Sequence, residues 1–261
     1  MQIEFYKYQG TGNDFVIMDN RDGRYSGLTT EQVNFLCNRR FGIGADGLML
    51  LNLQDGYDFA MKYYNADGRE STMCGNGGRC LVKFAWDMGL RRPQYHFIAV
   101  DGPHDAVVTE KGTVNLKMMD VSDVKPYEDA MVLQTGSPHY VKIVSDTELI
   151  DVVTEGRGIR YNGDFAPKGG INVNFLQITG DDSIRVRTYE RGVEDETYSC
   201  GTGVTAAALV AAHNENGFNH VAVSTKGGEL SVEFDKLGES RFENIWLCGP
   251  AEQVFKGTIS L

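Results

Sequence analysis

The chain has 261 residues, of which 41% are hydrophobic and 23% charged, a composition typical of a globular protein with one large or two ordinary domains. Its formal net charge of −11 disfavours broad electrostatic binding to nucleic acid or to an anionic membrane, because both are polyanions. A small molecule is therefore the expected partner.

The first ten residues, MQIEFYKYQG, lack the basic start and apolar stretch of a signal peptide. No apolar run approaches the ~20 residues needed to cross a bilayer. The cysteines are odd in number and scattered through a chain too large to need disulfides: Cys37, Cys74, Cys80, Cys200 and Cys248. These features predict a cytoplasmic protein.

In the first half, segments 3–8 and 15–19 are rich in β-formers and flank a turn-like stretch, so two strands are expected. The apolar spacing of LTTEQVNFLCNRR predicts a helix over 28–40, with Thr29 or Thr30 as its N-cap.

The later part of the first half and its counterpart in the second half follow one pattern. A strand over 57–68 ends in an NADG turn, and a helix over 74–89 is entered through glycines. An alternating strand over 183–192 is followed by an alanine-rich helix over 201–217, which is apolar on most sides and is therefore expected to be buried. Each helix is expected to stop at a glycine.

The chain contains an internal repeat. With an offset of 126, Cys74 falls on Cys200 and Tyr63 falls on Tyr189. The same offset pairs further residues: Glu70 with Glu196, Gly44 with Gly170, Gly75 with Gly201, and Gly77 with Gly203. With an offset of 124, TGNDFVI at 11–17 falls on TGSPHYV at 135–141.

A unit of well over 100 residues present twice differs from a solenoid, whose repeats are roughly 20 to 50 residues long. Two similar domains facing each other across a cleft are expected instead. The segment VSDVKPYEDA at 121–130 has the composition of the connection between them.

The repeated cysteines stand at the starts of two buried helices. A thiol there lies beside the unpaired N–H groups of the first turn and the positive end of the helix dipole. Such surroundings lower a thiol pKa from about 8.5 to roughly 3.5–7.5, which predicts that Cys74 and Cys200 can each be a thiolate. The glycines that follow allow a carboxylate to approach the same N–H groups.

Two such sites facing one substrate could invert a carbon centre. A thiolate on one side would take the α-proton, and a thiol on the other side would supply a new one. The backbone donors would stabilise the charge that develops on the carboxylate. Such a reaction requires no cofactor in principle, provided that water is excluded.

Other readings of these residues remain open. Buried cysteines are common core residues, and core packing is favoured for Cys37, Cys80 and Cys248. A zinc site is disfavoured because the Cys74 to Cys80 spacing is not Cys-x-x-Cys and no histidine pair has ligand spacing. A hydrolase would use one cysteine as nucleophile with His139 as base, and a binding module would keep the cleft without catalysis.

Seven motifs in this order resemble the diaminopimelate epimerase family, whose members invert an amino-acid centre without a cofactor. The resemblance covers essentially the whole chain and rests on QGTGNDF (9–15), RRFGIGADGL (39–48), YNADGRESTMCGNGGRC (64–80), GSPH (136–139), INVNF (171–175), YERGVEDET (189–197) and SCGTG (199–203).

The resemblance implies an α+β fold of two pseudosymmetric domains, each a curled, mostly antiparallel sheet wrapped around a central helix. The active site would lie in the interdomain cleft. The N-terminal half is expected over 1–120, completed by a strand over 250–261, and the C-terminal half over 121–249. The family is usually homodimeric.

The resemblance also implies the roles of individual residues. Cys74 and Cys200 would be the acid and base, and the α-carboxylate would meet the N–H groups of Gly75, Asn76, Gly201 and Thr202. The distal end of the substrate would be held by Asn13, Asn65, Asn172, Glu190 and Arg191, with His139 in support. A forked guanidinium suits a distal carboxylate, and a carboxylate suits a distal ammonium. Ordinary strand-end or turn chemistry is the alternative for these polar side chains.

Two positions depart from the family pattern. Some members carry glutamine where this chain has Gly47, and many carry asparagine where it has Ser137. Both lie on the substrate side, so a racemase of another amino acid is the closest alternative. The expected reaction is the interconversion of LL- and meso-diaminopimelate, in lysine and cell-wall precursor biosynthesis, with no cofactor and no metal.

Overall fold

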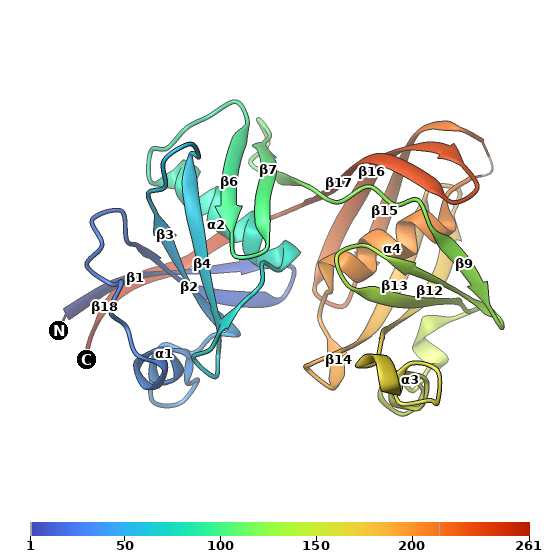
Figure 1. The fold of residues 1–261 in the computed structure, drawn as a ribbon, viewed down its shortest axis with the longest axis horizontal. Coiled ribbons are helices and arrows are strands. Elements are labelled where there is room, and N and C mark those ends of the chain that lie inside the picture. Colours follow the sequence, from blue (N-terminus) through green and yellow to red (C-terminus); the bar gives the residue numbers. More distant parts are fainter. Residues whose placement is uncertain (1, 214) are drawn as a thin grey trace. The chain divides into compact units, whose positions relative to one another are not determined.

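The computed structural model describes residues 2–213 and 215–261 and divides into two compact units (Figure 1). Unit 1 contains the chain up to Leu116 together with Gly249–Leu261, and unit 2 contains Lys117–Cys248. Unit 1 thus combines both ends of the sequence. No helix within the described residues is long and apolar enough to cross a membrane.

The sheet of unit 1 is mostly antiparallel. Its strands run in the order β18 (Glu252–Ser260), β1 (Gln2–Gly10), β2 (Asn13–Asp19), β3 (Gly47–Asn52), β4 (Phe59–Asn65), β6 (Tyr95–Ala99), β7 (Gly102–Val108) and β8 (Val114–Lys117), and β5 (Glu70–Ser71) also pairs with β4. The pairs β2–β3 and β4–β6 are parallel.

The sheet of unit 2 repeats this order. Its strands are β9 (Val124–Tyr127), β10 (Ala130–Gln134), β11 (Pro138–Ile143), β12 (Asn172–Gly180), β13 (Ser183–Glu190), β15 (Gly217–Thr225), β16 (Gly228–Gly238) and β17 (Arg241–Gly249), and β14 (Asp195–Thr197) also pairs with β13. The parallel pairs are β11–β12 and β13–β15, which match those of unit 1. The predicted α+β fold of two pseudosymmetric, mostly antiparallel domains is confirmed.

Each parallel pair requires a crossover, and a helix provides it. The first crossover contains α1 (Thr30–Cys37) in unit 1, and in unit 2 it contains α3 (Val152–Arg160) with the short 3-10 helices η1 (Thr147–Leu149) and η2 (Ala166–Lys168). The second contains α2 (Gly75–Asp87) or α4 (Gly201–Ala211). In each unit the strands surround this second helix, since α2 contacts β1, β2, β3, β7 and β18, and α4 contacts β10–β13, β15 and β16 (Figure 1).

The sheet of unit 1 has two differently packed faces because side chains alternate along a strand. One face packs against α1 through a buried cluster that includes Leu48, Leu50 and Tyr64. The other face lies towards α2, where Met49 approaches the first turn of the helix. The face towards α2 is the one that can present side chains to Cys74.

The strand register defines which residues of the two units correspond. In the parallel pair β2–β3, Phe15 lies opposite Gly47, and in β11–β12, His139 lies opposite Asn172. Because the offset of 124 places Phe15 on His139, Gly47 corresponds to Asn172.

The same register corrects one pairing of the sequence repeat. Tyr64 lies opposite Leu48, and Tyr189 lies opposite Val173, so these two tyrosines correspond. Both are buried in the clusters around the first-crossover helices. The predicted match of Tyr63 with Tyr189 is therefore wrong by one residue, and a slip of one residue moves a side chain to the other face of the sheet.

Several predicted bounds differ from the structure, and three of them are informative. Thr29, one of the two predicted caps, is the N-cap of α1, but the helix ends at Cys37, where the N–H groups of Ile43 and Gly44 donate to Leu36 O. Helix α4 ends at Ala211, short of the predicted end at 217, where β15 begins; residue 214 of the predicted helix lies outside the described residues. The segment predicted as a connection, 121–130, contains strand β9.

Two glycines in turns of unit 1 differ in the space around them. Gly68 and Gly56 both have positive φ angles, 86° and 83°, but a Cβ at Gly68 would lie 2.1 Å from Thr30 O, whereas nothing lies within 4 Å at Gly56. We expect Gly56→Ala to cost about 1 kcal/mol through backbone strain alone. Gly68→Ala should cost about 2 kcal/mol more, as measured by urea denaturation, and equal costs would contradict this account.

Candidate active site

In unit 1, Cys74 is the N-cap of α2 and is half-buried. Its Sγ accepts a hydrogen bond from Gly77 N at 3.2 Å, and the first intrahelical bond runs from Gly78 N to Cys74 O at 2.8 Å. A Cβ at Gly77 would lie 3.1 Å from Sγ, so glycine keeps this first turn open. The sulfur therefore lies where backbone N–H groups and the helix dipole stabilise a thiolate.

The amide of Asn76 links the start of α2 to β2. Asn76 is only 2% exposed, and its Nδ2 donates to Asn13 Oδ1 at 2.6 Å. Asn13 Nδ2 in turn donates to Asp46 Oδ2 at 3.0 Å. Thr11 Oγ1 donates to Asn76 Oδ1 at 3.4 Å. The structure thus brings two predicted site residues, Asn13 and Asn76, into direct contact.

A charged network holds this corner of unit 1. Arg39 makes ion pairs with Asp14 and Asp46 at 2.6 and 2.7 Å, and Lys7 pairs with Asp14 at 2.8 Å. Burial raises the pKa of Asp14, but hydrogen bonds from Arg39 and Lys7 outweigh it and lower that pKa to about 2. Asn65, at the end of β4, lies opposite Gly47 and is exposed.

In unit 2, Cys200 is the N-cap of α4 and is buried. Its Sγ lies 3.5 Å from Thr202 Oγ1, and Val204 N donates to Cys200 O at 2.8 Å. A Cβ at Gly203 would lie 2.4 Å from Asn174 Nδ2, so this glycine allows the first turn of α4 to approach β12 closely.

Next to this cysteine, His139 is fully buried in a hydrogen-bond network. Its Nδ1 lies 2.8 Å from Asn174 Oδ1, and its Nε2 lies 2.9 Å from both Ser137 Oγ and Thr202 Oγ1. Burial lowers the pKa of His139 to about 4, so the ring is neutral at neutral pH. Because Nδ1 donates to an amide oxygen, Nε2 must accept from one hydroxyl at a time.

The Thr202 hydroxyl therefore lies between the neutral imidazole and Cys200. When Ser137 donates to His139, Thr202 is able to donate to the sulfur, which suits a thiolate. When Thr202 donates to His139, its oxygen is able to accept from the thiol. The network can thus accommodate both protonation states of Cys200 without moving a heavy atom.

Asn172 connects this network to the end of β13. Its Nδ2 donates to Ser137 Oγ at 3.0 Å, and its Oδ1 accepts from Arg191 N at 2.8 Å. Glu190, the last residue of β13, precedes Arg191. These groups offer a cationic and an anionic side chain on one turn.

That turn is fixed by Glu194, which has a φ of 63°. Its carboxylate accepts from Gly192 N at 2.9 Å and pairs with Arg160 at 2.6 Å. Burial raises the pKa of Glu194, but the hydrogen bonds from Gly192, Tyr161 and Arg160 outweigh it and lower the pKa to about 2. The Glu194 carboxylate therefore holds the turn that carries Arg191 in place through its bonds to Gly192 and Arg160.

The other cysteines pack in the cores of their units. Burial raises the pKa of Cys37 to about 12 and also raises the pKa of Cys80, which is fully buried. Both thiols are therefore neutral. Cys248 Sγ lies 3.7 Å from Trp246 O. Within residues 2–213 and 215–261, no group of three His, Cys, Asp or Glu side chains is arranged to hold a metal ion.

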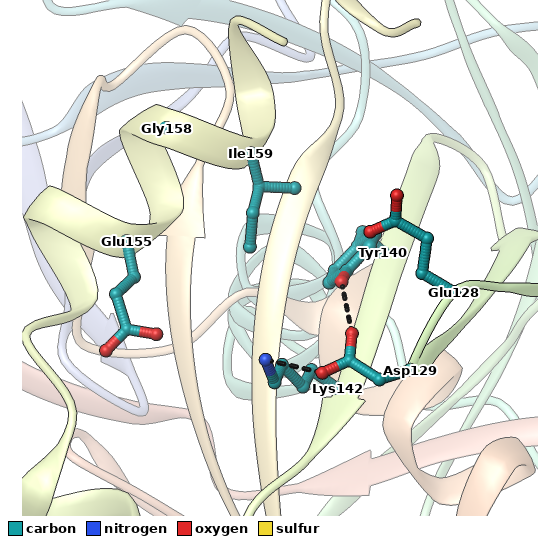
Figure 2. A pocket seen from close by; sticks show the side chains of 7 residues that line it. All are labelled: Glu128, Asp129, Tyr140, Lys142, Glu155, Gly158 and Ile159. Atoms are coloured by element: carbon teal, nitrogen blue, oxygen red, sulfur yellow. Dashed lines mark hydrogen bonds and ion pairs between the residues drawn. The ribbon is translucent and has the colours of Figure 1, made fainter.

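A separate pocket of about 480 Å³ lies on unit 2, beside α3 and β11 (Figure 2). Its lining residues are Glu128, Asp129, Tyr140, Lys142, Glu155, Gly158 and Ile159. Asp129 pairs with Lys142 at 2.7 Å and accepts from Tyr140 at 3.2 Å, while Glu128 and Glu155 add two further carboxylates to the lining. The pocket contains none of the predicted site residues.

Comparison with solved structures defines the class of the fold. A Bacillus anthracis phenazine biosynthesis protein of the PhzF family is similar over 100% of both chains, with a TM-score of 0.78 and 15% identity. A hydroxyproline epimerase from Agrobacterium vitis is similar over 99% of this chain and 91% of its own, with a TM-score of 0.67 and 16% identity. The chain therefore has the two-repeat fold that these proteins share.

Sequence comparison defines the family. The model of the family described as diaminopimelate epimerase matches residues 5–125 and 131–254. Diaminopimelate epimerase of Flavobacterium psychrophilum is 47% identical over 98% of this chain and 100% of its own length, and that of Chlorobaculum tepidum is 46% identical over 97% and 99%. The chain belongs to the diaminopimelate epimerase family.

Several supporting residues were not singled out from the sequence. Asp46, Asn174 and Glu194 hold the predicted site residues through hydrogen bonds. All three lie within the motifs that carry the family resemblance. Their place in these motifs is the sequence feature that could have identified them as part of the site. What each contacts depends on the pairing of strands that are distant in sequence.

The buried His139 predicts a pH dependence of stability. Its pKa in the folded state, about 4, is below the ordinary value of 6.5, so between these values the unfolded chain binds more protons. The free energy of unfolding should therefore fall as pH drops from about 6.5 to 4, by roughly 2–3 kcal/mol from this group.

Denaturant titrations across this range test the prediction. His139→Gln should remove much of the slope, whereas the exposed His220→Gln serves as the matched control and should keep it. An unchanged slope in His139→Gln would show that the imidazole is not the group responsible.

Proposed function

We propose that the chain interconverts LL- and meso-diaminopimelate by removing and replacing the proton on one α-carbon, and is thus an isomerase. The observation that carries this proposal is the pair of corresponding cysteines, each the N-cap of the helix around which its unit is built. Membership of the diaminopimelate epimerase family supports the substrate.

In the proposed mechanism, Cys74 and Cys200 act from opposite faces of the α-carbon. One thiolate takes the α-proton and becomes a thiol, the other thiol delivers its proton to the opposite face and becomes a thiolate, and the roles exchange with direction. The net charge of the pair is unchanged by a turnover. Each thiolate is stabilised at its helix start, as for Gly77 N and Cys74 Sγ.

Backbone donors would bind the substrate α-carboxylate. We assign this role to the first-turn N–H groups of Gly75, Asn76, Gly201 and Thr202, which lie at the helix starts. Negative charge spreads onto the carboxylate as the proton leaves, and donors already in place stabilise it. The reaction would then need no pyridoxal phosphate or metal.

The distal amino-acid group of the substrate carries a carboxylate and an ammonium, and each needs a partner of opposite charge. Arg191 would bind the distal carboxylate and Glu190 the distal ammonium, with amides from Asn13, Asn65 and Asn172 around them. His139 would support Cys200 through Thr202 rather than contact the substrate.

The proposal requires both half-sites to act on one substrate, in a cleft between the two domains. We further propose that the enzyme is a cytoplasmic homodimer and serves lysine and cell-wall precursor biosynthesis. Size determination in solution tests the dimer.

Incubating reduced protein with LL-diaminopimelate in D₂O tests the reaction directly. Loss of the α-proton signal together with formation of the meso isomer is expected. Cys74→Ala and Cys200→Ala should each abolish inversion, with losses of at least about 10³-fold, because each removes one of two required bases. Cys248→Ala is the matched control and should retain activity.

Other outcomes would favour other functions. Wild-type inversion in either alanine variant would overturn the two-base mechanism. Ligand protection against thermal unfolding without any proton exchange would indicate a binding module. A thioester trapped on one cysteine would indicate a hydrolase.

Oxidation provides an independent test. If both thiols approach one α-carbon, a mild oxidant should join Cys74 to Cys200 and inactivate the enzyme, and a thiol reductant should restore activity. Peptide mapping identifies the bridge. Full activity of protein in which the two thiols are demonstrably bridged would refute the mechanism.

A further inference from the structure

Gly47 creates space that the side chain of Tyr63 occupies. A Cβ at Gly47 would lie 2.5 Å from Tyr63 Cε2 and 2.9 Å from the tyrosine hydroxyl oxygen. Real Cβ atoms essentially never approach this closely, and a Cβ would also lie 2.5 Å from the backbone oxygen of Tyr64. Glycine is therefore required both for the ring of Tyr63 and for the backbone of β4 to lie this close to β3. Tyr63 is 8% exposed, and its ring packs edge-on against Phe15 at 6.1 Å.

This tyrosine lies on the same face of the sheet as the catalytic half-site. Tyr63 is opposite Met49 in the β3–β4 ladder, and Asn65 is opposite Gly47, so all four share one face. Met49 lies over the first turn of α2, since a Cβ at Gly77 would meet both Met49 Cε, at 3.4 Å, and Cys74 Sγ, at 3.1 Å. The neighbouring Tyr64, in contrast, packs in the cluster against α1.

The position in unit 2 that corresponds to Gly47 carries a polar side chain. The register makes Asn172 the counterpart of Gly47, and Asn172 presents an amide among the proposed substrate-binding groups. In unit 1 the glycine has no side chain, but the hydroxyl of Tyr63 lies over the same position of the sheet. A polar group from the adjacent strand thus takes the place of the missing side chain.

We propose that the Tyr63 hydroxyl binds the distal amino-acid group of the substrate, beside Asn65, and that Gly47 is required to place it there. This inference rests on the proposed function. It makes Gly47 and Tyr63 a specificity-determining pair, in which the departure from the glutamine of some family members is offset by a tyrosine on the next strand. A phenol can donate to a carboxylate or accept from an ammonium.

Tyr63→Phe tests this role because it removes one oxygen and keeps the ring over Gly47. Tyr64→Phe is the matched control, since it removes the same atom from the adjacent tyrosine, which faces the core. We expect Tyr63→Phe to lower kcat/KM for diaminopimelate about 10-fold, mainly by raising KM, since it weakens binding away from the reacting carbon. Tyr64→Phe should change kcat/KM less than about 2-fold.

Circular dichroism and the midpoint of thermal unfolding, measured for both variants, separate binding from folding. A Tyr63→Phe variant with wild-type stability and a raised KM supports the inference. Wild-type activity with unchanged KM in Tyr63→Phe, or equal effects of the two variants, would overturn it and leave the proposed function intact. Absence of α-proton exchange in the wild-type protein would overturn the proposed function, and this inference with it.

Discussion

Both half-sites depend on the close approach of a helix N-terminus to the sheet that surrounds it. A Cβ at Gly77 would lie 3.1 Å from the sulfur of Cys74 and 3.4 Å from Met49, which leaves little room, and a Cβ at Gly203 would lie 2.4 Å from Asn174 Nδ2, which is too close. This contact directs the first-turn N–H groups towards the cysteine side of the sheet, where burial from water makes their partial charge effective. The strands that wrap each helix fix its direction, and so fix where a substrate carboxylate would bind.

The two half-sites share a backbone plan but differ in chemistry. In unit 2, His139 and Asn174 form a buried polar network in which hydrogen bonds satisfy each group. Their counterparts in unit 1 by register are Phe15 and Met49, which are apolar. One cysteine is thus adjacent to a hydroxyl that is linked to a neutral imidazole, and the other accepts from the helix backbone beside apolar side chains. The two sulfurs therefore lie in unequal surroundings although their helices correspond.

The side chains proposed to hold the distal end of the substrate are positioned by residues that do not themselves belong to that set. Asp46 orients Asn13, and Glu194 clamps the turn that carries Arg191. The carboxylates that do this are themselves paired with arginines, Asp46 with Arg39 and Glu194 with Arg160. Such networks fix polar side chains before substrate arrives, which reduces the entropy lost on binding.

Local sequence determined the features that need only local chemistry. Glycines after Cys74 and Cys200 predicted helix starts, Thr29 predicted a cap, and the repeat predicted two domains, all in agreement with the structure. Only the folded structure decided where α1 and α4 end: the N–H groups of the loop residues Ile43 and Gly44 bond to Leu36 O at the end of α1, and α4 ends before β15 begins at Gly217.

The tertiary structure also decided that Tyr64, and not Tyr63, corresponds to Tyr189 of unit 2. Sequence similarity is insensitive to such a slip, whereas the pairing of β3 with β4 places Tyr64 in the cluster against α1 and Tyr63 on the opposite face, with Met49 and Gly47.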